Sequence, residues 1–149
     1  MRRIAFILLL VVIVGLGWEF LALHVDQPAV PTSAADAEAY TGVPLPPEAK
    51  NIRVAAYRQW IEYAQYVRFE APVSVCLKYA AKVAPGSALQ PVEIFQRKLD
   101  ARAPRQGVLD LTWFDLEAAT NVVGRLAGPP EADIWIDQDR GVFYFRKTD

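Results

Sequence analysis

The sequence predicts an α+β protein, in which an N-terminal transmembrane helix precedes a small antiparallel sheet of about four strands with helices on one face. Three observations lead to this prediction. An apolar run opens the chain, period-two alternation of apolar and polar residues marks strands at both ends of the remainder, and proline-opened helical stretches lie between them. The expected order is β-β-α-α-β-β, with the two hairpins meeting in one sheet.

The apolar run extends from Ile4 to Leu23 and is interrupted by a single glutamate. A helix of about 20 residues spans the ~30 Å hydrocarbon core of a bilayer. Trp18 lies near the outer end, at the depth where aromatic residues gather. Two arginines precede the run, whereas the next basic residue after it, apart from the histidine, is Lys50. The positive-inside rule therefore predicts a signal-anchor over residues 1–25, with the N-terminus in the cytoplasm and the remainder outside.

A cleaved secretory signal peptide is the alternative to this anchor. Such a peptide has an apolar run of ~7–15 residues, followed by a cleavage site of small residues. Here the run is longer, and the small residues at 33–35 lie about ten positions beyond it. An uncleaved anchor is therefore favoured, and a secreted domain stays open as the alternative.

A stalk is predicted over residues 26–50, because prolines at this density favour extended backbone. Within it, residues 34–40 have the composition of one or two helical turns, which Gly42 would end. The extracytoplasmic α+β domain is expected to occupy residues 51–149.

Alternation and turn residues place the elements of this domain. Two strands are expected over 52–60 and 61–70, although residues 57–64 also fit a helix. The clearest local signal is a hairpin over 132–146, in which aromatic and β-branched strands flank an Asp-x-Gly turn. Helices are expected between the hairpins, over residues 72–84, 91–99 and 113–127, the last with Thr112 as its N-cap and Asp115 in a capping box.

Charge and residue content exclude several functional classes. The formal net charge is −1 and no basic stripe occurs, so no nucleic-acid partner is expected. The single cysteine, Cys76, lies in an apolar helical stretch and is expected to be buried. The single histidine, His24, lies at the membrane face, so no Cys–His or Ser–His catalytic pair is predicted. No phosphate-binding loop or dinucleotide fingerprint occurs, and no cofactor is expected.

Three carboxylates near the C-terminal turn suggest a metal site as an alternative. Asp133, Asp137 and Asp139 stand close together before Gly141. A calcium loop of the EF-hand type needs further ligands and a distant glutamate, which this stretch lacks. Turn chemistry explains the aspartates without a metal, so no metal ligand is predicted. A metal-dependent hydrolase of the envelope remains the alternative function.

The first hairpin carries most of the remaining candidate residues. Glu62 and Glu70 are expected to form cross-strand ion pairs with Arg58 and Arg68 on a solvated face. A dense aromatic group is expected to pack in the core, with an interaction face as its second interpretation; its possible contact residues are Tyr57, Trp60, Tyr63 and Tyr66.

Two stretches resemble a group of small bacterial membrane-anchored or envelope proteins of unknown function. Residues 45–52 (LPPEAKNI) with 67–72 (VRFEAP) are similar to the opening of the group's domain, and residues 134–149 to its closing hairpin. The chain departs from the group at Glu48, where serine is common. The resemblance implies a bacterial envelope protein with an α+β domain, and it brings no activity or catalytic residue.

Together these features predict a non-enzymatic binding or accessory module, although an enzyme is not excluded. The module would be anchored by one helix in the bacterial inner (plasma) membrane, with its domain on the outer face. The membrane and an envelope protein are the expected partners. Anchoring raises the effective concentration of the domain for partners in the same membrane.

Overall fold

The computed structural model describes residues 33–59, 62–93, 111–125 and 132–148. No helix within these ranges is long and apolar enough to cross a membrane. The predicted anchor, with Ile4, Trp18 and Leu23, lies outside the described residues. The described elements are α2 (Ala34–Thr41), β1 (Lys50–Gln59), β2 (Glu62–Glu70), α3 (Val73–Val83), β3 (Gln90–Pro91), the 3₁₀ helix η1 (Leu116–Ala118), β4 (Val122–Arg125), β5 (Ala132–Asp137) and β6 (Val142–Thr148).

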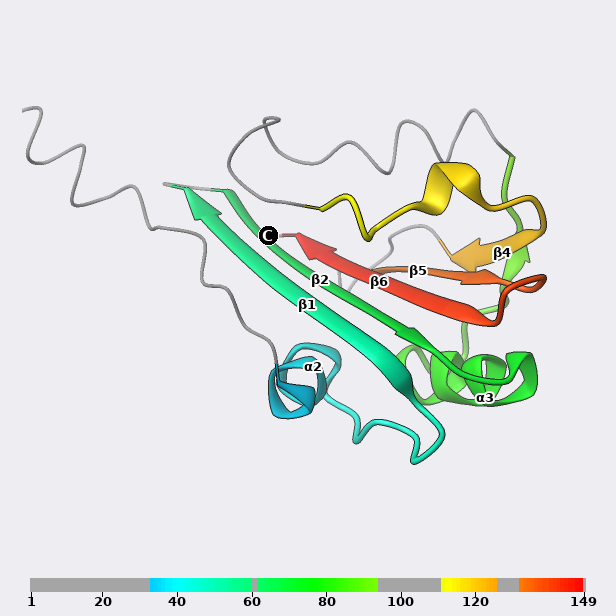
Figure 1. Cartoon of the computed structure of the whole chain (residues 1–149), viewed down its shortest axis with the longest axis horizontal. Helices are drawn as coiled ribbons and strands as arrows, with labels where there is room; N and C mark the ends of the chain where they lie inside the picture. The colour runs from blue at the N-terminus through cyan, green and yellow to red at the C-terminus, as the bar shows by residue number, and fades with distance from the viewer. Residues whose placement is uncertain (1–32, 60–61, 94–110, 126–131, 149) are drawn as a thin grey trace, which may run out of the picture.

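The centre of the fold is one antiparallel sheet of six strands in the order β1-β2-β6-β5-β4-β3 (Figure 1). Both predicted hairpins are confirmed, as β1 with β2 and β5 with β6. They join where β6 pairs with β2, so that Val67 lies opposite Phe145. The sheet is wider than the four strands predicted, because β4 adds to β5 and the short β3 adds to β4.

One face of the sheet is covered by α2 and α3 (Figure 1). The helix predicted over residues 72–84 is confirmed as α3, which begins after Pro72 and buries Cys76, Tyr79 and Ala80. Phe69 and Phe143 stack at 4.8 Å between ring centroids, and Tyr79 meets both rings edge-on. The apolar face of α3 and alternate residues of the strands thus form the first core.

The opposite face of the sheet is covered by the segment that carries η1. Phe114 lies at the centre of this second core and makes edge-on contacts with Tyr66, Trp135 and Tyr144. Leu116 is completely buried beside them. Because both faces are covered, every residue of β5 is buried, including two aspartates.

The helix predicted over residues 113–127 is wrong. Within its described part, residues 116–118 form a single 3₁₀ turn and residues 122–125 form strand β4. Thr, Asn, Val and Gly at positions 120–124 are poor helix formers, and pairing with β5 buries Val122. The expected element order therefore fails here. Pro91, the predicted start of another helix, lies in β3, and residues 94–99 lie outside the described residues.

The short helix predicted over residues 34–40 is confirmed as α2. Ser33 and Asp36 form a capping box, and Gly42 ends the helix in the left-handed conformation, with φ +70°. Ala37 is fully buried in the first core, and Thr41 Oγ1 lies 2.7 Å from Tyr79 Oη. Residues 33–49 thus pack on the domain instead of standing apart as a stalk, whereas residues 26–32 lie outside the described residues.

Candidate functional site

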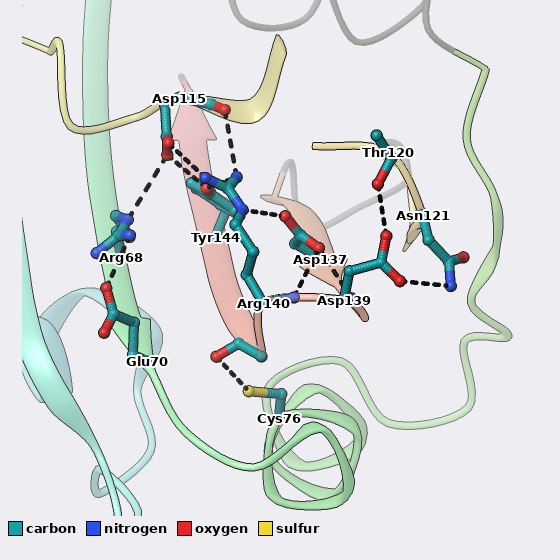
Figure 2. A network of polar contacts seen from close by, with 11 residues as sticks. Arg68, Glu70, Cys76, Asp115, Thr120, Asn121, Asp137, Asp139, Arg140 and Tyr144 are labelled. Carbon is teal, nitrogen blue, oxygen red and sulfur yellow. Dashed lines mark hydrogen bonds and ion pairs between the residues drawn. The ribbon is translucent and has the colours of Figure 1, made fainter. Parts of the chain in front are cut away.

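A chain of polar contacts crosses the η1 side of the sheet, with Asp115 at its centre (Figure 2). Tyr144 donates a hydrogen bond to Asp115 Oδ1 at 2.6 Å. Arg140 Nη1 donates to Asp115 Oδ2 at 2.6 Å, and Nη2 donates to Tyr144 Oη at 3.0 Å. Asp115 was expected to cap a helix. It instead anchors the η1 segment to strand β6 and to the β5–β6 turn.

Burial alone would raise the pKa of Asp115, but the hydrogen bonds from Tyr144 and Arg140 outweigh it and hold this pKa below its ordinary value. Burial and the same carboxylate raise the pKa of Tyr144. Asp115 is therefore ionised and Tyr144 neutral at physiological pH, as the donor–acceptor pattern requires.

The β5–β6 turn is organised by Asp137, whose side chain is 1% exposed. Its Oδ1 accepts hydrogen bonds from the backbone N–H groups of Asp139 and Arg140, at 3.0 and 3.1 Å. Its Oδ2 is paired with Arg140 Nε. Turn chemistry and an ion pair with the exposed Arg140 thus account for this buried carboxylate.

The alternative metal site used Asp133, Asp137 and Asp139. Asp133 is paired with Arg146 on the neighbouring strand, and Asp139 accepts hydrogen bonds from Thr120 and Asn121. Within the described ranges no group of three or more His, Cys, Asp or Glu residues is placed to hold a metal. The structure does not bring the three aspartates together as ligands.

Arg68 extends this network toward Glu70, but its guanidinium is incompletely hydrogen-bonded (Figure 2). Nη2 lies 2.9 Å from Glu70 Oε1, but Nε is 3.8 Å from Asp115 Oδ1, beyond hydrogen-bond range. Nε is buried and has no hydrogen-bond partner among the described residues, and only 13% of the side chain is exposed. Both Asp115 oxygens are already occupied by Tyr144 and Arg140.

A second arginine faces Arg68 across the first hairpin. Arg53 on β1 is the direct register partner of Arg68 on β2. Like charges directly opposite each other destabilise a sheet by a few tenths of a kcal/mol to about 1 kcal/mol. The two arginines, with Glu70, Trp113 and Asp115, line a pocket of about 420 Å³, which we call the arginine pocket.

The rim of the arginine pocket contains a strained residue. Asn51 has φ +50°, in the left-handed region that non-glycine residues seldom adopt, and it lies where the β1–β2 register shifts between Lys50 and Arg53. Its Nδ2 donates to Glu70 Oε2 at 2.6 Å. This hydrogen bond, with the pairing to Arg68, lowers the pKa of Glu70. Such strain often marks functional sites.

A larger pocket, of about 590 Å³, lies on the other side of Glu70, next to the start of α3 and the β5–β6 turn. Glu48, Lys50 and Arg140 bring both signs of charge to its wall. Glu70 is shared by the two pockets. The wall of this larger pocket also contains Asp139, so three carboxylates stand there with two cationic side chains.

The predicted site residues have different fates. Tyr66 is 3% exposed and packs against Phe114, so it belongs to the second core. Trp60 and the side chains of Tyr57 and Tyr63 lie outside the described residues, as do the side chains of Glu62 and Arg58. The ion pair predicted for Glu70 exists, but it joins two residues of the same strand.

Sequence reasoning missed Arg53, Trp113 and Asp115 as site residues. Arg53 alternates with apolar neighbours, and the register of the hairpin would have placed it opposite Arg68. No local signal pointed to Trp113 and Asp115, because they were assigned to a helix.

Cys76 is the remaining reactive residue type, and it is buried as predicted. Its Sγ lies 3.5 Å from the carbonyl oxygen of Ala71, and burial raises the pKa of the thiol to about 11. A thiol held protonated in this way is a poor nucleophile.

Comparison of the chain with protein-family models, with curated proteins and with solved structures found no match.

Proposed function

We propose that this protein is a non-enzymatic binding module, tethered at the outer face of a bacterial inner membrane, whose arginine pocket receives an anionic group of its ligand. The observation that supports this most directly is the pairing of Arg53 with Arg68 in one pocket, where Nε of Arg68 has no hydrogen-bond partner among the described residues. Glu70 and Asp115 lie within ion-pair distance of the same guanidinium. The tether itself rests on residues 4–23 of the sequence.

The chemistry of the two guanidinium groups favours a carboxylate or a similar oxyanion. Arginine offers planar N–H donors that match two oxygens at once. An anion between Arg53 and Arg68 would relieve their repulsion and accept hydrogen bonds from both.

Binding is favoured over catalysis by the state of the neighbouring groups. Asp115 is ionised and both its oxygens are occupied, and Glu70 is fixed by Asn51 and Arg68. A general acid or base needs a pKa near the working pH, and the pKa values of both carboxylates are lowered away from it. Trp113 offers an apolar wall for the remainder of a ligand.

The proposal is tested with the full chain in detergent micelles and glutarate as a probe, at constant ionic strength with chloride as the reference. Ligand binding to the folded state raises stability by RT ln(1 + [L]/Kd), about 1.4 kcal/mol at ten times Kd. We expect glutarate to raise Tm for the wild type and for Lys78→Gln. The latter removes one exposed positive charge from α3, on the other face of the sheet.

Arg68→Gln and Arg53→Gln should lose most of the glutarate effect. Arg53 is exposed, so its replacement leaves the core intact and keeps the test valid if Arg68→Gln folds poorly. An equal Tm increase in wild type and Arg53→Gln, or none in the wild type, would refute the proposal.

The tether is tested separately by the intact mass of the protein recovered from carbonate-washed membranes. The full-length mass in the membrane pellet supports the anchor. A soluble product that lacks roughly the first thirty residues would show that a signal peptide was removed.

A further inference from the structure

We infer that the ligand is an extended acidic segment of a partner protein, which adds as a strand to the free edge of β1 and places a carboxylate in the arginine pocket. This inference rests on the proposed function and adds the class of ligand and the way it is held. The free edge of β1, the positive charge of this strand and the register of the sheet support the inference.

Strand β1 forms one end of the sheet, and within the described ranges no strand pairs with its outer edge (Figure 1). It has 10 residues, whereas strands of globular proteins usually have about 5–6. Helix α2 packs against one face of the sheet. An edge of this length presents a row of backbone donors and acceptors, to which extended peptides bind in β-augmentation.

The positive charge of β1 favours an acidic segment at this edge. The strand contains Lys50, Arg53 and Arg58 and no acidic residue. Pairing with a second copy of β1 would bring positive charges against each other, which disfavours self-association through this edge. A segment with aspartate or glutamate would instead complement the strand, so we take the occupant to be an acidic segment of another protein.

A row of directly paired residues connects the edge of β1 with the arginine pocket. Arg53, Arg68, Tyr144 and Trp135 follow one another across β1, β2, β6 and β5 as direct partners. An added strand would lie ~4.8 Å beyond β1. Its residue opposite Arg53 would have its Cβ about 4.5–5.5 Å from that of Arg53, on the same face. A glutamate there would point its carboxylate along this row toward Arg68.

Glu70 competes with the ligand's carboxylate for the Arg68 guanidinium. It contacts Arg68 through one oxygen, while Asn51 holds the other. Removing the Glu70 charge would leave Arg68 without its close carboxylate contact and remove repulsion of the incoming group. Glu70→Gln is therefore expected to tighten binding, a result that partial unfolding of a variant would not produce.

The test uses short fluorescent peptides of alternating threonine and valine with one central glutamate, and measures anisotropy with the full chain in micelles. A matched peptide carries glutamine in place of the glutamate. We expect the glutamate peptide to bind at least about tenfold more tightly, the usual effect of a charge-assisted hydrogen bond. Arg53→Gln should abolish this preference, Glu70→Gln should increase the affinity severalfold, and Lys78→Gln should change neither.

Backbone N-methylation separates strand addition from simple ion pairing. Two versions of the glutamate peptide are prepared. One is methylated on the odd-numbered backbone amides and the other on the even-numbered ones. In strand addition only one set faces β1, so one version loses binding by about tenfold or more and the other keeps it. Equal affinity of both versions and the unmethylated peptide, or of the glutamate and glutamine peptides, would overturn the inference.

The outcomes also distinguish this inference from the proposed function. If glutarate stabilises the protein through Arg53 and Arg68 but the peptides show no glutamate preference or methylation effect, the extended segment is wrong and the anion pocket stands. If neither glutarate nor the glutamate peptide binds, both fail.

Discussion

Gly141 in the β5–β6 turn packs against Ala71, which lies just before α3. Replacement of Gly141 by alanine is expected to be unusually destabilising. The residue has φ +66°, and an alanine Cβ would lie 2.5 Å from the carbonyl oxygen of Ala71. The carbonyl oxygen of Gly141 also accepts a hydrogen bond from the Ala71 N–H at 2.9 Å. Because the contact is with backbone, no side-chain rotation can relieve it.

Gly86→Ala is the matched control for this substitution. Gly86 has φ +78°, but a Cβ there would have nothing within 4 Å. Left-handed backbone costs alanine roughly 1–2 kcal/mol, which applies to both sites. Overpacking adds about 1–3 kcal/mol at Gly141 alone. We therefore expect losses of about 1–2 kcal/mol for Gly86→Ala and about 2–5 kcal/mol for Gly141→Ala.

Urea unfolding of the full chain in micelles, followed by tryptophan fluorescence, measures this difference. The two variants should have similar m values and clearly separated midpoints. If Gly141→Ala were no less stable than Gly86→Ala, the close docking of the turn against Ala71 would be incorrect.

Three further outcomes are expected. Gly124→Ala should lower the free energy of unfolding by about 1–3 kcal/mol in urea melts, because its Cβ would lie 2.8 Å from both the carbonyl oxygen of Ile134 and the Trp135 side chain, and an unchanged midpoint would contradict this. Cys76 should resist alkylation at pH 8 in the folded protein and react in urea, since its pKa is raised to about 11; rapid native labelling would contradict its burial. Asp115 has a lowered pKa in the folded state, so its stabilising contribution is present above the ordinary carboxyl pKa of 3.8 and is lost as pH falls through the lower folded value. The stability difference between wild type and Asp115→Asn should therefore be constant near neutral pH and shrink in acid, and a difference independent of pH would be inconsistent with it.

The elements predicted correctly are those set by short-range patterns. The β5–β6 hairpin was recognised because its turn and its aromatic strands are adjacent in sequence. Helix α2 followed from the composition of residues 34–40 and from Gly42 at its end. Its burial against the sheet could not be predicted locally, because it depends on contacts such as that between Thr41 and Tyr79, which are distant in the chain.

Residues 113–127 show why the remaining prediction failed. Their apolar residues recur at helical spacing, but Phe114 and Leu116 are buried on the sheet face and Val122 in a strand. Strand pairing with β5 and the Asp115 contacts override the weak helix preference of this stretch. The candidate site was missed for the same reason, since Trp113 and Asp115 of its wall come from this segment.

The arginine pocket is tested most directly by NMR of the arginine Nε–Hε groups during a glutarate titration of the full chain. Nε of Arg68 has no hydrogen-bond partner among the described residues, whereas Nε of Arg140 is paired with Asp137. We expect the Arg68 signal to move progressively with glutarate and not with chloride, while the Arg140 signal stays in place. An Arg68 signal that does not respond to glutarate would contradict the claim that this pocket receives an anionic group.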